Sequence, residues 1–141
     1  MRDWDFRGDV LASARHAAGL SQRALASAIH LVDEDRVGLW ERGAARPHAR
    51  LIPLIARHLH VEPLTLVTGP TDAPDLTRLR VAAGLSLQEM ASRAGLPLSS
   101  YHRLEKRGAP QGGLQRDIAR AIATAVGVPV RQVEALVQPP K

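Results

Sequence analysis

Residues 98–107 carry a run of polar and basic side chains that could contact a partner. Leu98, Tyr101 and Leu104 follow one another at positions i, i+3 and i+6, which predicts that these three face inward on a helix. The outward residues are then Ser99, Ser100, His102, Arg103 and Lys106. Their chemistry is hydrogen bonding and positive charge. The segment therefore predicts a short, polar, net-positive helix held out on a compact scaffold.

Catalytic and metal chemistry have less support. His58 and His60, with Glu62 nearby, superficially suggest a metal site. On a helix, residues i and i+2 point about 200° apart, so these two imidazoles cannot bind one ion. The chain also contains no nucleophile–base motif, phosphate-binding glycine loop or metalloprotease motif. The sequence therefore predicts neither a metal nor another cofactor, and it argues against an enzyme.

The stretch 84–108 contains the elements that must position the polar helix. Ser86 can cap a first helix, whose apolar residues are Met90, Ala91 and Ala94. Gly95 ends that helix, because glycine tolerates the left-handed conformation that turns the chain away. Pro97 presets the backbone for a second helix that begins near Leu98. The pattern predicts two short helices joined by a tight turn.

An internal repeat determines the predicted architecture. Residues 15–29 align with residues 80–94 at a constant offset of 65, with eight identical positions, and the offset becomes 64 by Glu41 and Glu105. We therefore expect a first domain at 1–68, a linker at 69–75 and a second domain at 76–141. The linker prediction rests on two prolines, a glycine and helix-capping residues within a few positions.

The first copy is predicted to contain five helices, with Ser21 and Asp33 as caps. They are expected at 9–18, 22–29, 34–43, 50–61 and 62–69. His30 occupies the position of Gly95, so we expect a non-glycine residue in the left-handed region there. Pro53 is expected in the first turn of the fourth helix, where its missing N–H costs little. In the second copy, later helices are expected at 114–126 and 128–136.

Composition agrees with a folded helical protein. The 141 residues are 45% hydrophobic and only 3% aromatic, which favours closely packed helices built from aliphatic residues and alanine. The absence of cysteine excludes disulfides and thiolate metal sites and suits a reducing cytosol. The first residues show neither a signal peptide nor a membrane span. We therefore expect a cytoplasmic protein with no membrane partner.

The positive charge is unevenly distributed along the chain. The formal net charge is +5. Residues 1–70 hold nine arginines against eight acids, a net of +1, while residues 71–141 hold ten lysines and arginines against six acids, a net of +4. This balance is compatible with nucleic acid or another anionic surface, although a charge of this size alone does not distinguish them.

The spacing Ala91-x-x-x-Gly95, with apolar residues at 96, 101 and 104 and an acid at 105, resembles the lambda-repressor-like (Cro/XRE-type) helix-turn-helix family. The resemblance extends upstream through Leu76-x-x-x-Arg80 to Ser86, and downstream to about residue 136. It implies an all-α fold of two tandem five-helix domains that bind double-stranded DNA. It also implies buried bridges in the scaffold, Arg15 with Glu41 and Arg80 with Glu105.

The resemblance implies a set of DNA contacts in each copy. In the second copy they are Ser86, Gln88, Leu98, Ser99, Ser100, His102, Arg103, Lys106 and Arg107. In the first copy they are Gln22, Arg23, Arg36, Arg42 and Arg46. A helix-turn-helix lays its second helix in the major groove, and helix N-termini and flanking basic residues hold phosphates.

The first copy carries three acids where its third helix begins, at Asp33, Glu34 and Asp35. Carboxylates repel phosphates, although one could accept a hydrogen bond from cytosine, and they also favour the positive end of the helix dipole. Two readings of this copy stay open: it contacts bases, or it positions the protein, dimerises or binds another protein.

We therefore expect a small bacterial transcriptional regulator, nucleoid-associated in the cytoplasm. We expect it to bind double-stranded DNA with helix three of one or both domains. It could also form a homodimer or bind a protein partner. The alternative is a protein-interaction adaptor that keeps the fold but makes little contact with DNA.

Overall fold

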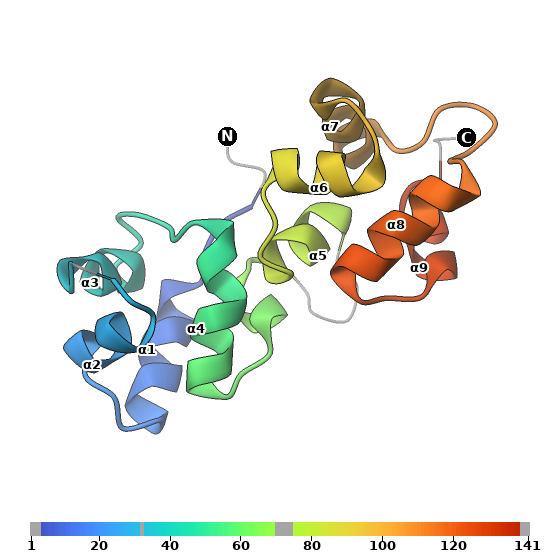
Figure 1. Cartoon of the computed structure of the whole chain (residues 1–141). Helices are drawn as coiled ribbons and strands as arrows, with labels where there is room; N and C mark the ends of the chain where they lie inside the picture. Colours follow the sequence, from blue (N-terminus) through green and yellow to red (C-terminus); the bar gives the residue numbers. More distant parts are fainter. Residues whose placement is uncertain (1–3, 32, 70–74, 139–141) are drawn as a thin grey trace. The chain divides into compact units, whose positions relative to one another are not determined.

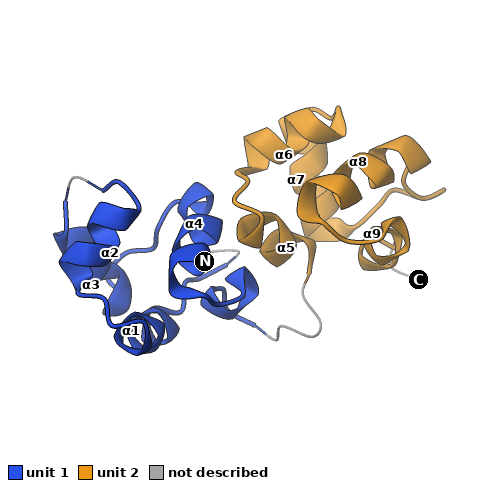
Figure 2. Ribbon diagram, turned by 60° about the horizontal axis from the view of Figure 1, so that its bottom comes forward, with its two compact units in different colours: residues 1–74 blue, residues 75–141 orange. Residues whose placement is uncertain are grey.

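The computed structural model describes residues 4–31, 33–69 and 75–138. The chain divides into two compact units, 1–74 and 75–141, which are coloured separately in Figure 2. Regular structure in the described ranges is helical apart from one isolated antiparallel bridge between Phe6 and Val67. This confirms the all-α prediction. Most of the predicted linker, at 70–74, lies outside the described residues.

In its described residues, unit 1 contains four α-helices and two short 3-10 helices (Figure 1). They are α1 (Gly8–Ala17), α2 (Gln22–Ala28), α3 (Asp35–Glu41), η1 (Ala49–Leu51), α4 (Ile52–Leu59) and η2 (Pro63–Leu66). The predicted fourth helix therefore begins with a 3-10 turn. The predicted fifth helix is only a 3-10 turn, after which Val67 joins the bridge to Phe6.

Local sequence accounts for the turns of unit 1. The Ser21 hydroxyl accepts a hydrogen bond from the Ala24 N–H and so caps α2. His30 has a φ of 62°, which confirms the expected left-handed residue. The Asp33 carboxylate accepts from the Asp35 N–H at 2.9 Å at the start of α3. Pro53 lies in the first turn of α4, as predicted.

The N-terminal segment packs into the core of unit 1. Trp4 and Phe6 are both buried, and the Phe6 ring meets the Trp40 ring edge-on at 6.5 Å between centroids. Such aromatic pairs add to the stability that buried area provides. The core itself is formed by fully buried aliphatic side chains from α1, α2, α3 and α4, which include Leu11, Leu25, Val37, Ile52 and Ile55.

Unit 2 contains five α-helices over residues 75–138. They are α5 (Leu76–Ala82), α6 (Leu87–Ala94), α7 (Leu98–Arg107), α8 (Arg116–Val126) and α9 (Val130–Leu136). Their core is an aliphatic cluster with one aromatic ring and includes Leu85, Met90, Tyr101, Ile122 and Val133. In Figure 1, α6 and α7 meet at the tight turn predicted for residues 95–97. None of the helices found in the described ranges is long and apolar enough to cross a membrane.

The boundaries of α6 and α7 follow from their capping residues. Ser86 and Glu89 form a reciprocal capping box at the start of α6. Gly95 ends that helix with a φ of 73°, where a side chain would be strained. On α7, Tyr101 and Leu104 are buried as predicted, but Leu98 is 48% exposed. The inward prediction for Leu98 is therefore wrong.

Candidate nucleic-acid interface

In unit 2, a buried ion pair holds α7 against α5. Arg80 Nε donates to Glu105 Oε2 at 2.7 Å, and the two side chains are only 4% and 2% exposed. Arg80 Nη1 also donates to the Leu85 carbonyl at 2.8 Å, and Thr77 Oγ1 donates to Glu105 Oε1 at 3.0 Å. The ionised groups therefore have several polar partners, which a buried pair requires. The Arg80–Glu105 bridge is confirmed, while the part played by Thr77 was not predicted.

The corresponding pair in unit 1 is also present. Arg15 Nε donates to Glu41 Oε2 at 2.6 Å, and Arg15 Nη1 donates to the Leu20 carbonyl at 2.9 Å. Burial acts to raise the pKa of Glu41, but the hydrogen bonds from Arg15 and Gln22 outweigh it and hold that pKa below its usual value. The same contact raises the pKa of Arg15. The bridge ties α1 to the end of α3, as predicted.

The outer side of α7 is an open, cationic surface. Its side chains at the predicted contact positions are all exposed: Leu98, Ser99, Ser100, His102, Arg103, Lys106 and Arg107. Within the described ranges, no ion pair or side-chain hydrogen bond is found for Arg103, Lys106 or Arg107. The one acid of this helix, Glu105, points inward to Arg80. We call this set of seven residues the α7 face.

The start of α6, the helix that precedes α7, contributes two of the predicted DNA contacts. The Ser86 hydroxyl accepts a hydrogen bond from the Glu89 N–H at 3.1 Å, so it is engaged in the cap. Gln88 is exposed, and its side chain makes no hydrogen bond or ion pair with the residues that the structure describes. Glu89 brings a carboxylate to this helix end, where it accepts from the Ser86 N–H. Gln88 is thus more available to a phosphate than Ser86 is.

In unit 1, two predicted contact residues are engaged inside the unit. Gln22 Nε2 donates to Glu41 Oε1 at 3.0 Å, which turns its amide toward the buried bridge. Arg23 pairs with Glu34 at 3.0 Å, although both side chains are mostly exposed, at 85% and 51%. Exposed pairs of this kind are weak, so Arg23 can leave Glu34 at little cost.

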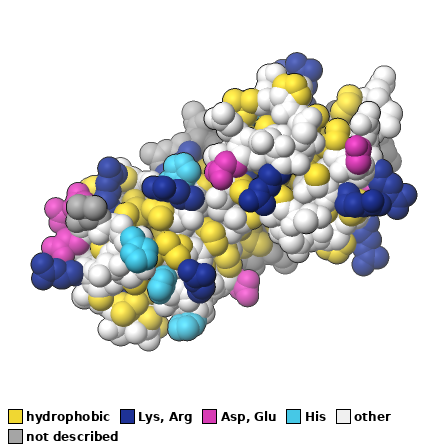
Figure 3. All heavy atoms as spheres, viewed as in Figure 1, with side chains coloured by type: hydrophobic (Ala, Val, Ile, Leu, Met, Phe, Trp, Pro, Cys, Tyr) yellow, Lys and Arg dark blue, Asp and Glu magenta, His cyan; other side chains and the backbone are white. Residues whose placement is uncertain are grey.

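The acidic start of α3 is exposed. Asp33, Glu34 and Asp35 all face solvent. In Figure 3, acidic side chains gather at the edge of unit 1 that α3 occupies, with a basic group beside them. A phosphate backbone approaching this edge would meet carboxylates before arginines.

The remaining basic residues of unit 1 have different surroundings. Arg36 and Arg42 are exposed, and Arg42 Nη1 lies 3.1 Å from where a Cβ on Gly38 would stand. Arg46, by contrast, is half-buried, places its guanidinium 4.1 Å from the Trp4 ring centroid and donates to the Trp4 carbonyl. That cation–π contact gives Arg46 a scaffold role beside the N-terminal segment.

The histidines do not gather into a metal site. Among the residues that the structure describes, no group of three or more His, Cys, Asp and Glu side chains could hold a metal ion. His58 lies in α4, whereas His60 follows the helix end with a φ of 57°. The fourth helix is predicted to include both His58 and His60, and that prediction is wrong for His60.

The comparisons with known proteins bear on the fold of both units. A family model described as a helix-turn-helix domain matches the chain twice, at residues 8–67 and 75–136. No match was found among curated proteins or among solved structures. The two matches correspond to α1 through η2 and to α5 through α9. Together they cover most of the chain, so it belongs to the helix-turn-helix domain family and carries two tandem copies of that domain.

Proposed function

We propose that the chain is a bacterial transcriptional regulator of the lambda-repressor-like (Cro/XRE) type, acting at the nucleoid in the cytoplasm. Unit 2 binds double-stranded DNA in a sequence-specific manner. Helix α7 enters the major groove, and the N-terminus of α6 lies across the backbone. The chemistry requires no cofactor and no catalytic residue.

The observation that carries this proposal is the α7 face. It presents arginine, lysine, histidine and serine to solvent, and the acid of the same helix is neutralised inside the unit. Arg103 can pair with guanine through two hydrogen bonds, and the exposed Leu98 can touch a thymine methyl. Lys106 and Arg107 at the end of α7 are suited to flanking phosphates.

Unit 1 supports a more limited role in DNA binding. Its α3 begins with exposed carboxylates, Gln22 is hydrogen-bonded to the buried bridge, and Arg23 lies beside the exposed acid Glu34. We infer that unit 1 adds mainly non-specific affinity through Arg36 and Arg42. If both units bind at once, the chain can occupy two adjacent half-sites, which lie about 34–36 Å apart on B-DNA.

The Arg23–Glu34 pair also favours a second candidate function. A surface with closely spaced charges of both signs suits a protein partner or a second copy of the chain better than it suits DNA. In this alternative the chain is an adaptor that keeps the fold and contacts DNA only weakly.

A salt series separates the two functions. Double-stranded fragments are first selected from random DNA with the full chain, and binding is then measured by fluorescence anisotropy from about 50 to about 200 mM salt. A regulator loses affinity steeply, because phosphate contacts release counterions, and Lys106→Gln lowers the slope by about 1. Arg131→Gln, an exposed change on α9, is the matched control. If the chain does not bind DNA at low salt, or if its affinity does not change across the salt series, the result supports the adaptor instead.

A further inference from the structure

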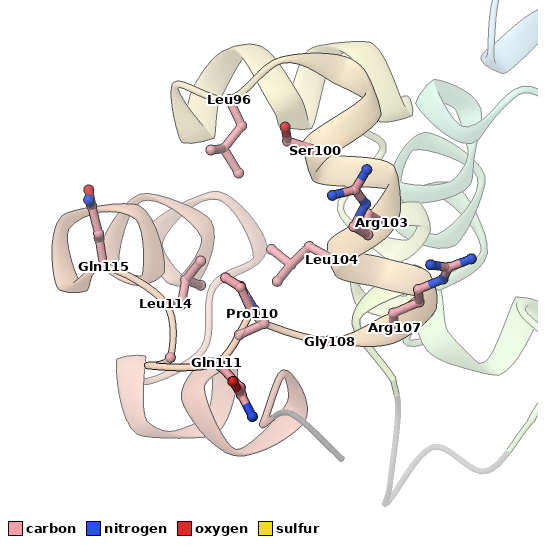
Figure 4. Close-up of a pocket in the computed structure, with 12 residues that line it drawn as sticks. Leu96, Ser100, Arg103, Leu104, Arg107, Gly108, Pro110, Gln111, Leu114 and Gln115 are labelled. Carbon is pink, nitrogen blue, oxygen red and sulfur yellow. The ribbon is translucent and has the colours of Figure 1, made fainter.

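An open cavity of about 650 Å³ lies within unit 2, between α7 and the segment 108–115. Figure 4 shows Leu96, Leu104 and Leu114 turned toward its centre, with Pro110 beside them. The volume falls in the range of sites that bind small organic molecules. DNA binding by the α7 face makes no use of this cavity.

Backbone contacts fix the path of the chain where the segment 108–115 leaves α7. The Ala109 N–H donates to the Val137 carbonyl at 2.6 Å, which ties the start of the segment to the chain after α9. Gly108 has a φ of 82°, and a Cβ there would stand 3.1 Å from the Val137 carbonyl oxygen. Because glycine is needed at that close approach, the opening is a consequence of specific backbone packing.

The rim of the cavity differs chemically from its floor. Ser100, Arg103 and Arg107 lie at i, i+3 and i+7 on one side of α7 and line the rim, while leucines form the floor. In Figure 4 the Arg103 guanidinium lies beside the opening and that of Arg107 extends away from it. Among the described residues, no carboxylate lines the cavity. An apolar floor under a cationic rim matches a molecule with an apolar body and one negative charge.

We propose that this cavity binds a small amphipathic carboxylate. Its apolar body lies against Leu96, Leu104 and Leu114, and its carboxylate accepts hydrogen bonds from the Arg103 guanidinium. Arginine and carboxylate pair well because the planar fork of donors fits the two oxygens. Ser100 can donate a further hydrogen bond at the same rim.

Ligand binding also has a consequence for DNA. Arg103 and Ser100 line the cavity and belong to the α7 face. A carboxylate that neutralises Arg103 therefore removes a DNA contact, so ligand and DNA compete. This coupling rests on the proposed function, whereas ligand binding itself does not.

The test uses the full chain and octanoate as the probe, with octanol as its neutral analogue, in isothermal titration calorimetry. Octanoate is expected to bind at one site per chain and at least about tenfold more tightly than octanol, since a charge-assisted hydrogen bond distinguishes them. Arg103→Gln is expected to remove that preference. Leu114→Gln is expected to weaken both compounds by about tenfold, and Arg131→Gln to leave both unchanged.

Circular dichroism melting of each variant shows whether the fold is retained, and Arg103 is exposed, so its replacement leaves the core intact. The proposal is overturned if octanoate at about 10 mM does not bind the wild-type chain. It is also overturned if the Arg103→Gln and Leu114→Gln variants bind octanoate as tightly as the wild type does. Equal affinity for octanol overturns the choice of an anion. Anisotropy with selected DNA is run separately: octanoate binding without any DNA binding refutes the proposed function alone.

Discussion

The two helix-turn-helix units share a scaffold and differ in the surface that it supports. Each unit joins its first helix to its third through an arginine–glutamate bridge, and in each the same arginine donates to a carbonyl five residues further on. The third helix, however, is seven residues long in unit 1 and ten in unit 2. It begins among exposed acids in α3, while α7 begins after Pro97 with Leu98 and two serines.

This difference shows which positions the fold constrains. The bridge recurs in both units because it holds the third helix in place, and the buried positions stay apolar or aromatic although their residues differ, with Val37 and Trp40 where unit 2 has Tyr101 and Leu104. The outward side chains contribute little to stability, so they can diverge without loss of the fold. We infer that the two units have divided their work, with unit 2 as the main reader of DNA.

The largest effect is expected from breaking the bridge in unit 2. Glu105→Ala leaves the Arg80 guanidinium buried with fewer partners and should cost about 3–5 kcal/mol. Both tryptophans, Trp4 and Trp40, lie in unit 1. Urea unfolding followed by far-UV circular dichroism should therefore show the loss, while the tryptophan fluorescence transition stays in place. An equal shift in both signals would contradict independent scaffolds.

Two glycines of unit 1 test its packing. A Cβ on Gly8 would stand 2.2 Å from the Trp40 carbonyl oxygen, so Gly8→Ala must displace backbone and should cost about 1–3 kcal/mol. A Cβ on Gly38 would meet only side-chain ends, Arg42 Nη1 at 3.1 Å and the Gln22 amide at 3.5 Å, so Gly38→Ala should stabilise α3 by about 0.5–1 kcal/mol. Tryptophan fluorescence in urea measures both. Destabilisation by Gly38→Ala would show that Arg42 is held firmly in place.

Matched arginine replacements compare the two DNA faces. Arg103→Ala should weaken binding to selected DNA by about 1–3 kcal/mol and relax base preference at one position. Arg36→Ala on α3 should weaken binding less and leave base preference unchanged, because α3 is expected to hold only phosphate. Anisotropy on a panel of single-base variants measures both. A larger loss of preference with Arg36→Ala would reverse the assignment of the reading unit.

Removing an acid from unit 1 should sharpen the same comparison. Glu34→Gln deletes one exposed carboxylate and releases Arg23, so DNA binding should strengthen by up to about 1 kcal/mol at low salt. The gain should shrink as salt screens the charges. Glu134→Gln, an exposed acid on α9, is the control. Weaker binding after Glu34→Gln would mean that this carboxylate makes a favourable contact, for example with cytosine.

The smallest effect concerns pH. The folded state lowers the pKa of Glu41, so the stability that this group contributes is present above its ordinary pKa of 4.5 and is lost as pH falls through the folded value. The urea concentration at the midpoint of unfolding, measured by tryptophan fluorescence, should therefore decrease as the pH is lowered below about 4.5. The part of this pH dependence that is due to Glu41 should be absent from the Glu41→Gln variant. An unchanged pH dependence in the variant would assign the acid sensitivity to other carboxylates.

Much of the scaffold could be predicted from the sequence because repeated patterns expose it. The bridge residues recur at matching positions in the two copies, and the caps at Ser21 and Ser86 precede apolar helical runs. Leu98 was assigned wrongly because six residues rotate a helix by about 600°, so Leu98 lies about 120° away from Leu104 around α7. Equal spacing by three does not keep three residues on one face.

The surroundings of individual side chains could not be predicted in the same way. Arg46 lies over Trp4, which is 42 residues earlier in the chain, and Gln22 turns inward to Glu41. These contacts depend on how separate segments pack, and no local pattern encodes them. The cavity beside α7 has the same origin, since the pairing of Ala109 with Val137 is a long-range contact.

The bridge between Phe6 and Val67 brings residues 5–7 and 66–68 of unit 1 side by side. The Arg7 N–H donates to the Leu66 carbonyl at 2.7 Å, and the Thr68 N–H donates to the Asp5 carbonyl at 3.0 Å. A pulling force applied between these two segments would break the hydrogen bonds that join them one at a time. Unit 1 should consequently unfold at a low pulling force.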